Sequence, residues 1–220
     1  MKADVGGTQI ELRPNSPPYL LKRMVSDGFD IALIFVLFML LTMLLLKTPL
    51  ADAYHAHYER CRVIESETAE AYPDDAAAIR AALRANTEYR DEHLASGLRL
   101  YLVKAVACFL AELPVLLVVP LLNKNRCTPG KLMTGIMPFC ESRRSRARRS
   151  HAVSTFLFVF LIDSLGLYLL TETLTFLLVP VLRLTEMLLN RKKYKTVLDF
   201  LTGTTMIEKL SYDEIGRAHV

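Results

Sequence analysis

Carboxylates interrupt the apolar stretches of this chain at three places. Asp30 lies in "GFDIALIF", Glu112 in "FLAELPVL" and Asp163 in "FLFVFLIDSLG". An ionised carboxylate surrounded by hydrocarbon is unfavourable by several kcal/mol, so it needs a cation, a hydrogen-bond donor or water beside it. Membrane proteins use such groups to bind cations and to relay protons. The three residues therefore predict an intramembrane site for a proton or a monovalent cation.

A second interpretation uses the same charges for structure. Arg23 precedes Asp30 by seven residues, which places both near one face of a helix. Asp199 follows a basic cluster at 191–195. A network of Arg23, Asp30, Asp199 and the loop arginines would lock helix ends together instead of moving an ion. The sequence leaves both interpretations open.

Long apolar blocks dominate the composition, in which 52% of the residues are hydrophobic. The blocks are 28–46, 98–122 and 152–189. A membrane-spanning helix needs about 20 apolar residues, so each of the first two blocks fits one span. A single helix over the third block would measure about 57 Å, far more than the ~30 Å hydrocarbon core. We therefore expect a hairpin of 152–170 and 173–189 that turns near Glu172, giving four spans, with three spans as the alternative.

The charges between the blocks predict the topology. The loop 123–150 carries eight basic residues and one acidic residue, whereas 48–97 carries five basic and ten acidic residues. Basic loops stay on the cytoplasmic side. We therefore expect both termini inside, a multi-pass protein of the plasma or inner membrane, and 48–97 outside. Residues 1–22 would be a cytoplasmic tail before an uncleaved anchor.

The predicted fold class is all-α, a polytopic helical bundle over 23–207 that is interrupted by a helical insertion at 48–97. "PDD" at Pro73–Asp75 is typical of a helix start, and a mild apolar stripe runs through 76–96. Residues 208–220 form a C-terminal tail. Its last seven residues, "EIGRAHV", match the translation of a common sequencing adapter. We expect the natural chain to differ there and keep 214–220 out of the functional argument.

Three motifs resemble binding sites of other kinds, but their residues or positions argue against those functions. "TPGKL" lacks the first glycine and the Ser or Thr of a nucleotide-binding loop, and Pro129-Gly130 instead predicts a turn. The basic run 143–149 lies beside an apolar block, so we expect contact with anionic lipid headgroups and not with nucleic acid. His55 and His57 would diverge on a helix, so we expect no metal site. With no catalytic residues or cofactor motif evident, an enzyme is not expected.

Four short stretches, in this order and spacing, resemble the RDD family of small membrane proteins. The first is Arg23-x-x-Ser26-x-x-x-Asp30, and the second is the loop "TPGKLMTG", matched through Thr128, Gly130, Lys131 and Gly135. The third is Asp163. The fourth is "TVLDFLTGT", matched through Asp199, Gly203 and Thr204. The family's second aspartate corresponds to Asp163 or Asp199, and Asp199 fits better. Arg126 stands where the family loop has its first glycine, and Ser26 replaces a small apolar residue.

The resemblance implies a polytopic membrane protein, and some relatives are described as cation–proton antiporters. This agrees with a site formed by Arg23, Asp30, Glu112, Asp163 and Asp199. The alternative function is a non-transporting module that assembles with another membrane protein.

Overall fold

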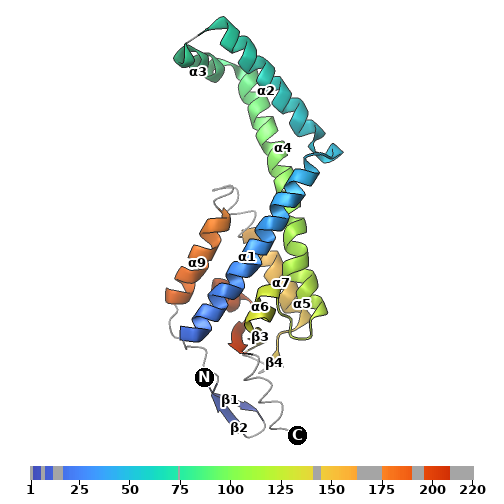
Figure 1. The fold of residues 1–220 in the computed structure, drawn as a ribbon, viewed down its shortest axis with the longest axis vertical. Helices are drawn as coiled ribbons and strands as arrows, with labels where there is room; N and C mark the ends of the chain where they lie inside the picture. The colour runs from blue at the N-terminus through green and yellow to red at the C-terminus, as the bar shows by residue number, and fades with distance from the viewer. Residues whose placement is uncertain are drawn as a thin grey trace. The chain divides into compact units, whose positions relative to one another are not determined.

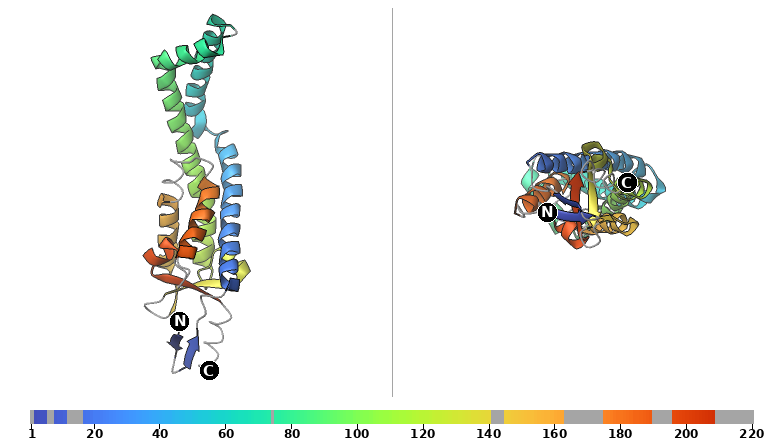
Figure 2. Two further views of the ribbon diagram at one scale, coloured as in Figure 1. Left: turned by 90° about the vertical axis from the view of Figure 1, so that its left-hand side faces the viewer. Right: turned by 90° about the horizontal axis from the view of Figure 1, so that it is seen from below.

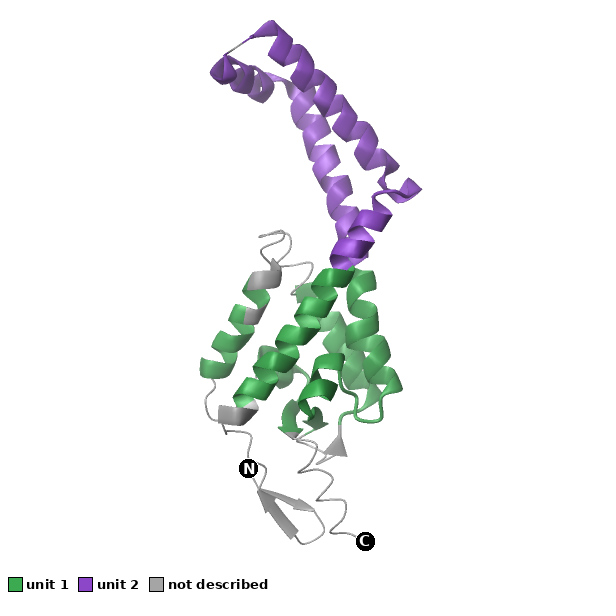
Figure 3. Cartoon of the chain, viewed as in Figure 1, with its two compact units in different colours: residues 1–37, 108–220 green, residues 38–107 purple. Residues whose placement is uncertain are grey.

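The structure, a computed structural model, describes residues 2–5, 8–11, 17–73, 75–140, 145–162, 175–189 and 196–208. The chain divides into two compact units (Figures 1 and 3). Unit 1 comprises residues 1–37 and 108–220, and unit 2 comprises 38–107. Unit 2 contains the segment 48–97 that was predicted as an insertion. Each unit is described by itself.

Unit 1 is mainly helical. It contains the first part of α1 (Pro17–Leu45) and the end of α4 (Thr87–Glu112), which continues through the π-helix η2 (Leu113–Val118) into α5 (Val119–Leu122). Pro114 at the start of η2 has no N–H to donate, and this interrupts the regular helical ladder. The remaining long helices are α7 (Arg149–Phe158) and α9 (Thr175–Leu189).

The third apolar block is divided between two helices. α7 continues in π form through residues 159–162, and α9 begins at Thr175. The two helices run in opposite directions (Figures 1 and 2). Side chains of both line one pocket. This agrees with the expected hairpin. The turn at Glu172 and Asp163 lie outside the described residues, and the number of membrane spans stays a prediction.

Two short segments, built from the same order of elements, form a small sheet. The all-α prediction did not include this sheet. Each is a helix of five or six residues, a glycine and a strand: α6 (Pro129–Thr134) leads to β3 (Ile136–Cys140), and α10 (Val197–Leu201) leads to β5 (Thr204–Glu208). Gly135 and Gly203 have φ values of 68° and 63°, a conformation that glycine adopts without strain. Pro129–Gly130 thus begins a helix and not the expected turn, because proline suits the first helical position.

The strands β3 and β5 pair antiparallel, from Ile136 opposite Glu208 to Cys140 opposite Thr204. The short strand β4 (Ser145–Arg146) pairs with the other edge of β3. The sheet lies across one end of the unit 1 helices (Figure 2). A separate hairpin of β1 (Lys2–Val5) and β2 (Thr8–Glu11) precedes α1.

Unit 2 is a helical hairpin. After the 3-10 turn η1 (Pro49–Ala51), α2 (Asp52–Ala71) and α3 (Ala76–Ala85) lead into α4. The carboxylate of Asp75 accepts hydrogen bonds from the N–H groups of Ala77 and Ala78, so the predicted helix start is confirmed. The helix expected through 76–96 is broken at Asn86, whose backbone is extended.

Polar side chains tie α2 to α4 on this hairpin. Three pairs bridge the helices: Arg60 Nη2 to Glu88 Oε1, Tyr89 Oη to Glu65 Oε1, and His57 Nδ1 to Glu92 Oε2, each at 2.6 Å. Pairs on or near the surface contribute little to the stability of a fold, because water and salt screen them.

Two helical stretches are long and apolar enough to cross a membrane, Leu20–Leu45 and Thr87–Leu122. Only 17% of the most apolar window of the first and 39% of that of the second is buried. The core helix of a soluble protein would hide most of such a window. The exposed side chains on α1 include Phe29, Phe35, Val36, Leu40, Met43 and Leu44.

Candidate functional site

Arg23 and Asp199 form a buried ion pair within unit 1. The Nη2 group of Arg23 donates to Oδ2 of Asp199, and the two side chains are 4% and 3% exposed. Arg23 lies near the start of α1, whereas Asp199 lies in α10. The pair therefore fastens the first long helix to the last short one. The structural interpretation of these two charges agrees with this contact.

Asp199 also begins its own helix. Thr196 precedes α10, and its hydroxyl accepts from the N–H of Asp199 at 3.2 Å, while the carboxylate of Asp199 accepts from the N–H of Thr196 at 2.9 Å. This reciprocal arrangement is a capping box. Burial alone would raise the pKa of Asp199, but the charge of Arg23 and the hydrogen bonds from Arg23 and Thr196 outweigh it. The pKa of Asp199 consequently lies below its ordinary value, and the carboxylate stays ionised.

Asp30 caps the other short helix. Thr128, at the position before α6, donates its hydroxyl to Oδ2 of Asp30, and the N–H of Gly130 donates to Oδ1 at 2.7 Å. The carboxylate thus accepts a hydrogen bond from the first turn of α6. At a helix start the N–H groups without helical partners and the helix dipole both favour a negative charge. Asp30 and Asp199 have equivalent roles, since each carboxylate accepts from the threonine that precedes a short helix.

Gly130 allows α6 to lie directly against α1. A Cβ atom at Gly130 would lie 2.1 Å from the carbonyl oxygen of Ser26 and 3.1 Å from Cγ of Asp30. Ser26 itself is fully buried. A small residue at position 26 and a glycine at position 130 are therefore required by one contact.

Lys131 links the two capped helices electrostatically. Its charge acts on Asp30, on Asp199 and on His151 in α7. Burial, followed by the charge of Lys131, lowers the pKa of His151 to about 4. The Nδ1 atom of His151 is buried without a hydrogen-bond partner among the described residues. His151 was not a predicted site residue, and only its position before the third apolar block distinguishes it in the sequence.

Arg126 occupies the loop position at which the family pattern has glycine. Its φ is 57°, in the left-handed region that glycine adopts easily. Its Nη1 group donates to the carbonyls of Leu121 and Asn123 at 2.5 and 3.0 Å, which satisfies the end of α5. A glycine would adopt this backbone without strain, and the carbonyl contacts of Arg126 offset part of the strain that its side chain causes.

Glu112 lies apart from this network. It ends α4, just before η2, and is 2% exposed. The thiol of Cys108, one helical turn earlier, donates to Oε1 at 3.6 Å. The predicted grouping of Glu112 with Asp30 is not among the described contacts. Asp163, the third predicted carboxylate, lies outside the described residues, as do Arg143 and Arg144 of the basic run.

A small cavity with polar and apolar walls adjoins the network inside unit 1. It has a volume of about 70 Å³, enough for roughly one or two waters. Six of its lining residues are polar: Asp27, Asp30, Thr128, Lys131, Thr155 and Arg183. The hydroxyl of Thr155, a residue that is 6% exposed, has no hydrogen-bond partner within the described part of the chain. η2 and the π-helical end of α7 both contribute to the wall, through Leu116 and Val159.

Sequence reasoning did not single out Thr155. No spacing rule marks Thr155, because its partners in the cavity come from other helices. Thr196 did carry a signal, since T-x-x-D is the pattern of a capping box. Among the residues that the structure describes, no three His, Cys, Asp or Glu side chains lie together as a metal site.

No known family model, curated protein or solved structure matches this chain significantly.

Proposed function

We propose that the chain is a multi-pass membrane protein, similar to the RDD family, that moves a proton or a monovalent cation through unit 1. The observation that carries this proposal is the cavity lined by Asp27, Asp30 and the unpartnered hydroxyl of Thr155. A buried hydroxyl without a hydrogen-bond partner is unfavourable unless a water or an ion takes the place of that partner.

The membrane location is supported by the two long apolar helices, whose apolar side chains are largely exposed. Burying them in lipid removes that surface from water, whereas a water-soluble fold would leave it unfavourably solvated. The plasma or inner membrane, the four spans and the cytoplasmic N-terminus are proposed from the charges of the loops.

Among the transported species, the proton fits the lining better than a metal cation. The described wall carries two carboxylates and two basic groups, Lys131 and Arg183, which offset each other and repel a further fixed cation. Asp30 accepts two hydrogen bonds but retains acceptor capacity for a water. Water beside carboxylate groups is a medium for proton relay.

Proton movement is tested in vesicles that contain the full chain and an internal pH-sensitive dye. A sodium or potassium gradient should produce a pH change, and Asp27→Asn or Thr155→Val should abolish it without disturbing the Arg23–Asp199 pair. Asp163→Asn is expected to have the same effect. Thr185→Val is the matched control, because the Thr185 hydroxyl bonds to its own helix at an exposed position. If no alkali cation drives a pH change, transport is excluded.

The alternative proposal is a module that assembles with another membrane protein through unit 2. The unit has a small buried core and exposes large apolar side chains, including Tyr58, Val63, Tyr72 and Leu94. Crosslinking from α2 and α4 in native membranes should then recover one specific membrane protein. Recovery of this chain alone would contradict the proposal.

A further inference from the structure

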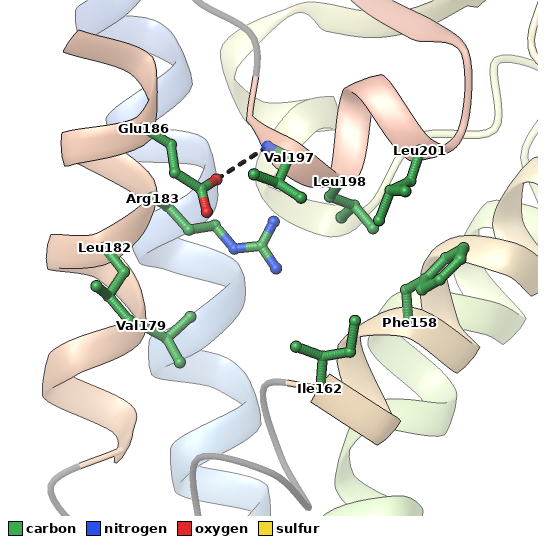
Figure 4. Close-up of a pocket in the computed structure, with 9 residues that line it drawn as sticks. All are labelled: Phe158, Ile162, Val179, Leu182, Arg183, Glu186, Val197, Leu198 and Leu201. Carbon is green, nitrogen blue, oxygen red and sulfur yellow. Dashed lines mark hydrogen bonds between the residues drawn. The ribbon is translucent and has the colours of Figure 1, made fainter. Parts of the chain in front are cut away.

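A second, larger pocket of unit 1 lies between α7, α9 and α10, with a volume of about 230 Å³ (Figure 4). Most of its wall is apolar, and Phe158 and Ile162 of α7 face Val179 and Leu182 of α9. The side chain of Arg183 points from α9 into this space (Figure 4). The pocket therefore joins an apolar slot to a permanent positive charge.

Glu186, the acidic residue of the pocket, already binds a backbone N–H group. Oε2 of Glu186 accepts a hydrogen bond from the N–H of Val197 at 3.0 Å, at the start of α10 (Figure 4). Arg183 presents five N–H donors in a planar fork and can hold several partners at once. The guanidinium is the group of this pocket that suits a phosphate, since it can bind two phosphate oxygens together.

The surroundings of the pocket are apolar as well. Ile162, Val197 and Leu201, which line it, are 53%, 56% and 49% exposed, and the nearby Leu161 and Phe200 are exposed too. In the membrane placement proposed above, this surface faces acyl chains. Arg183 lies six residues before the end of α9, or about 9 Å at 1.5 Å per residue, so its long side chain can reach headgroup depth.

We propose that this pocket binds one anionic phospholipid, with its phosphate on Arg183 and an acyl chain in the slot between α7 and α9. The site is distinct from the surface contacts expected of the basic run 143–149, because it combines a half-buried charge with an apolar slot between helices. The inference rests on the proposed membrane location but not on ion transport.

The absence of tryptophan from the chain permits a direct test. Phe158→Trp places a single fluorophore in the pocket wall, and Leu157→Trp places one on the exposed face of the same helix. Each variant is reconstituted into phosphatidylcholine vesicles containing a small fraction of either phosphatidylglycerol or phosphatidylcholine with brominated acyl chains, which quench tryptophan on contact.

We expect the tryptophan at position 158 to be quenched more strongly by the brominated phosphatidylglycerol than by the brominated phosphatidylcholine. Arg183→Gln should abolish this preference, whereas the tryptophan at position 157 should be quenched equally by both lipids. Equal quenching at position 158, or a preference that survives Arg183→Gln, would overturn the proposal. If neither position is quenched at all, the membrane location itself is wrong.

A second measurement avoids the added tryptophan. Native mass spectrometry of the unmodified chain in mild detergent should retain phosphatidylglycerol in preference to phosphatidylcholine. Arg183→Gln should lose the retained lipid, while Arg90→Gln on the exposed face of α4 should keep it. Retention that is unchanged in Arg183→Gln would contradict the site even if the tryptophan variants fail to fold.

Discussion

Arg23 and Asp199, 176 positions apart in the sequence, form an ion pair whose side chains are almost completely buried. The capping box of α10 holds the carboxylate, and α1 supplies the guanidinium. A buried pair is costly to break, because removing one partner leaves the other charge in a medium that solvates it poorly. This contact therefore makes the junction of α1 and α10 sensitive to single substitutions.

Neutralising either partner should destabilise the protein strongly. For Asp199→Asn or Arg23→Gln we expect a loss of about 3–5 kcal/mol in the free energy of unfolding, measured by denaturant titration in detergent. The double substitution should lose less than the sum of the two, because no unpaired charge remains. Arg62→Gln removes an exposed pair with Glu59 and should change stability by about 0.5 kcal/mol at most. Additive losses would show that the two residues do not interact.

The contact of α6 with α1 predicts a clash at Gly130. In Gly130→Ala the new methyl group would meet the Ser26 carbonyl at 2.1 Å, so one helix must shift. We expect a loss of about 1–3 kcal/mol or more, as for overpacked sites, together with faster proteolysis of the 123–135 loop. Gly28→Ala on α1 meets nothing within 4 Å and should be neutral or stabilising by about 0.5–1 kcal/mol. Equal stability of both variants would argue against the close approach.

The cap of α6 by Asp30 gives a third prediction. Thr128→Val removes the hydroxyl that donates to the carboxylate and should destabilise by about 1.5–3 kcal/mol, the range for hydrogen bonds to charged groups. Thr134→Val is the control, because the Thr134 hydroxyl bonds only within its own helix. Thermal unfolding of both variants compares the two roles. A loss at Thr134 equal to that at Thr128 would contradict the capping role.

His151 predicts a pH dependence of stability. Its pKa is about 4 in the folded chain, mainly because of burial, whereas an unfolded chain has the ordinary value of 6.5. Between these values the unfolded state binds the extra proton, so stability falls as the pH is lowered from about 6.5 to 4. The full effect is on the order of 3 kcal/mol at 1.36 kcal/mol per pKa unit. His151→Gln should flatten this slope, while His93→Gln, at an exposed position, should not; identical slopes would exclude the effect.

The sequence by itself determined the local features of this protein. The apolar blocks predicted the main helices, T-x-x-D contains a capping box, and glycines at 135 and 203 suit helix ends with positive φ. These features depend on residues within about one helical turn of each other, so periodicity and spacing reveal them. The strands β3 and β5 escaped prediction because segments of five residues are too short for the apolar pattern to distinguish a strand from a turn or a helix.

Only the tertiary structure decided which charges meet. Spacing placed Arg23 and Asp30 near one face of their helix, but packing pairs Arg23 with Asp199 and places Asp30 at the start of α6. Likewise, Thr155 and Arg183 line one cavity although they belong to two different helices. The physical reason is that a buried polar group takes whichever partner the packing brings within hydrogen-bond distance, and that partner can lie more than 100 residues away in sequence.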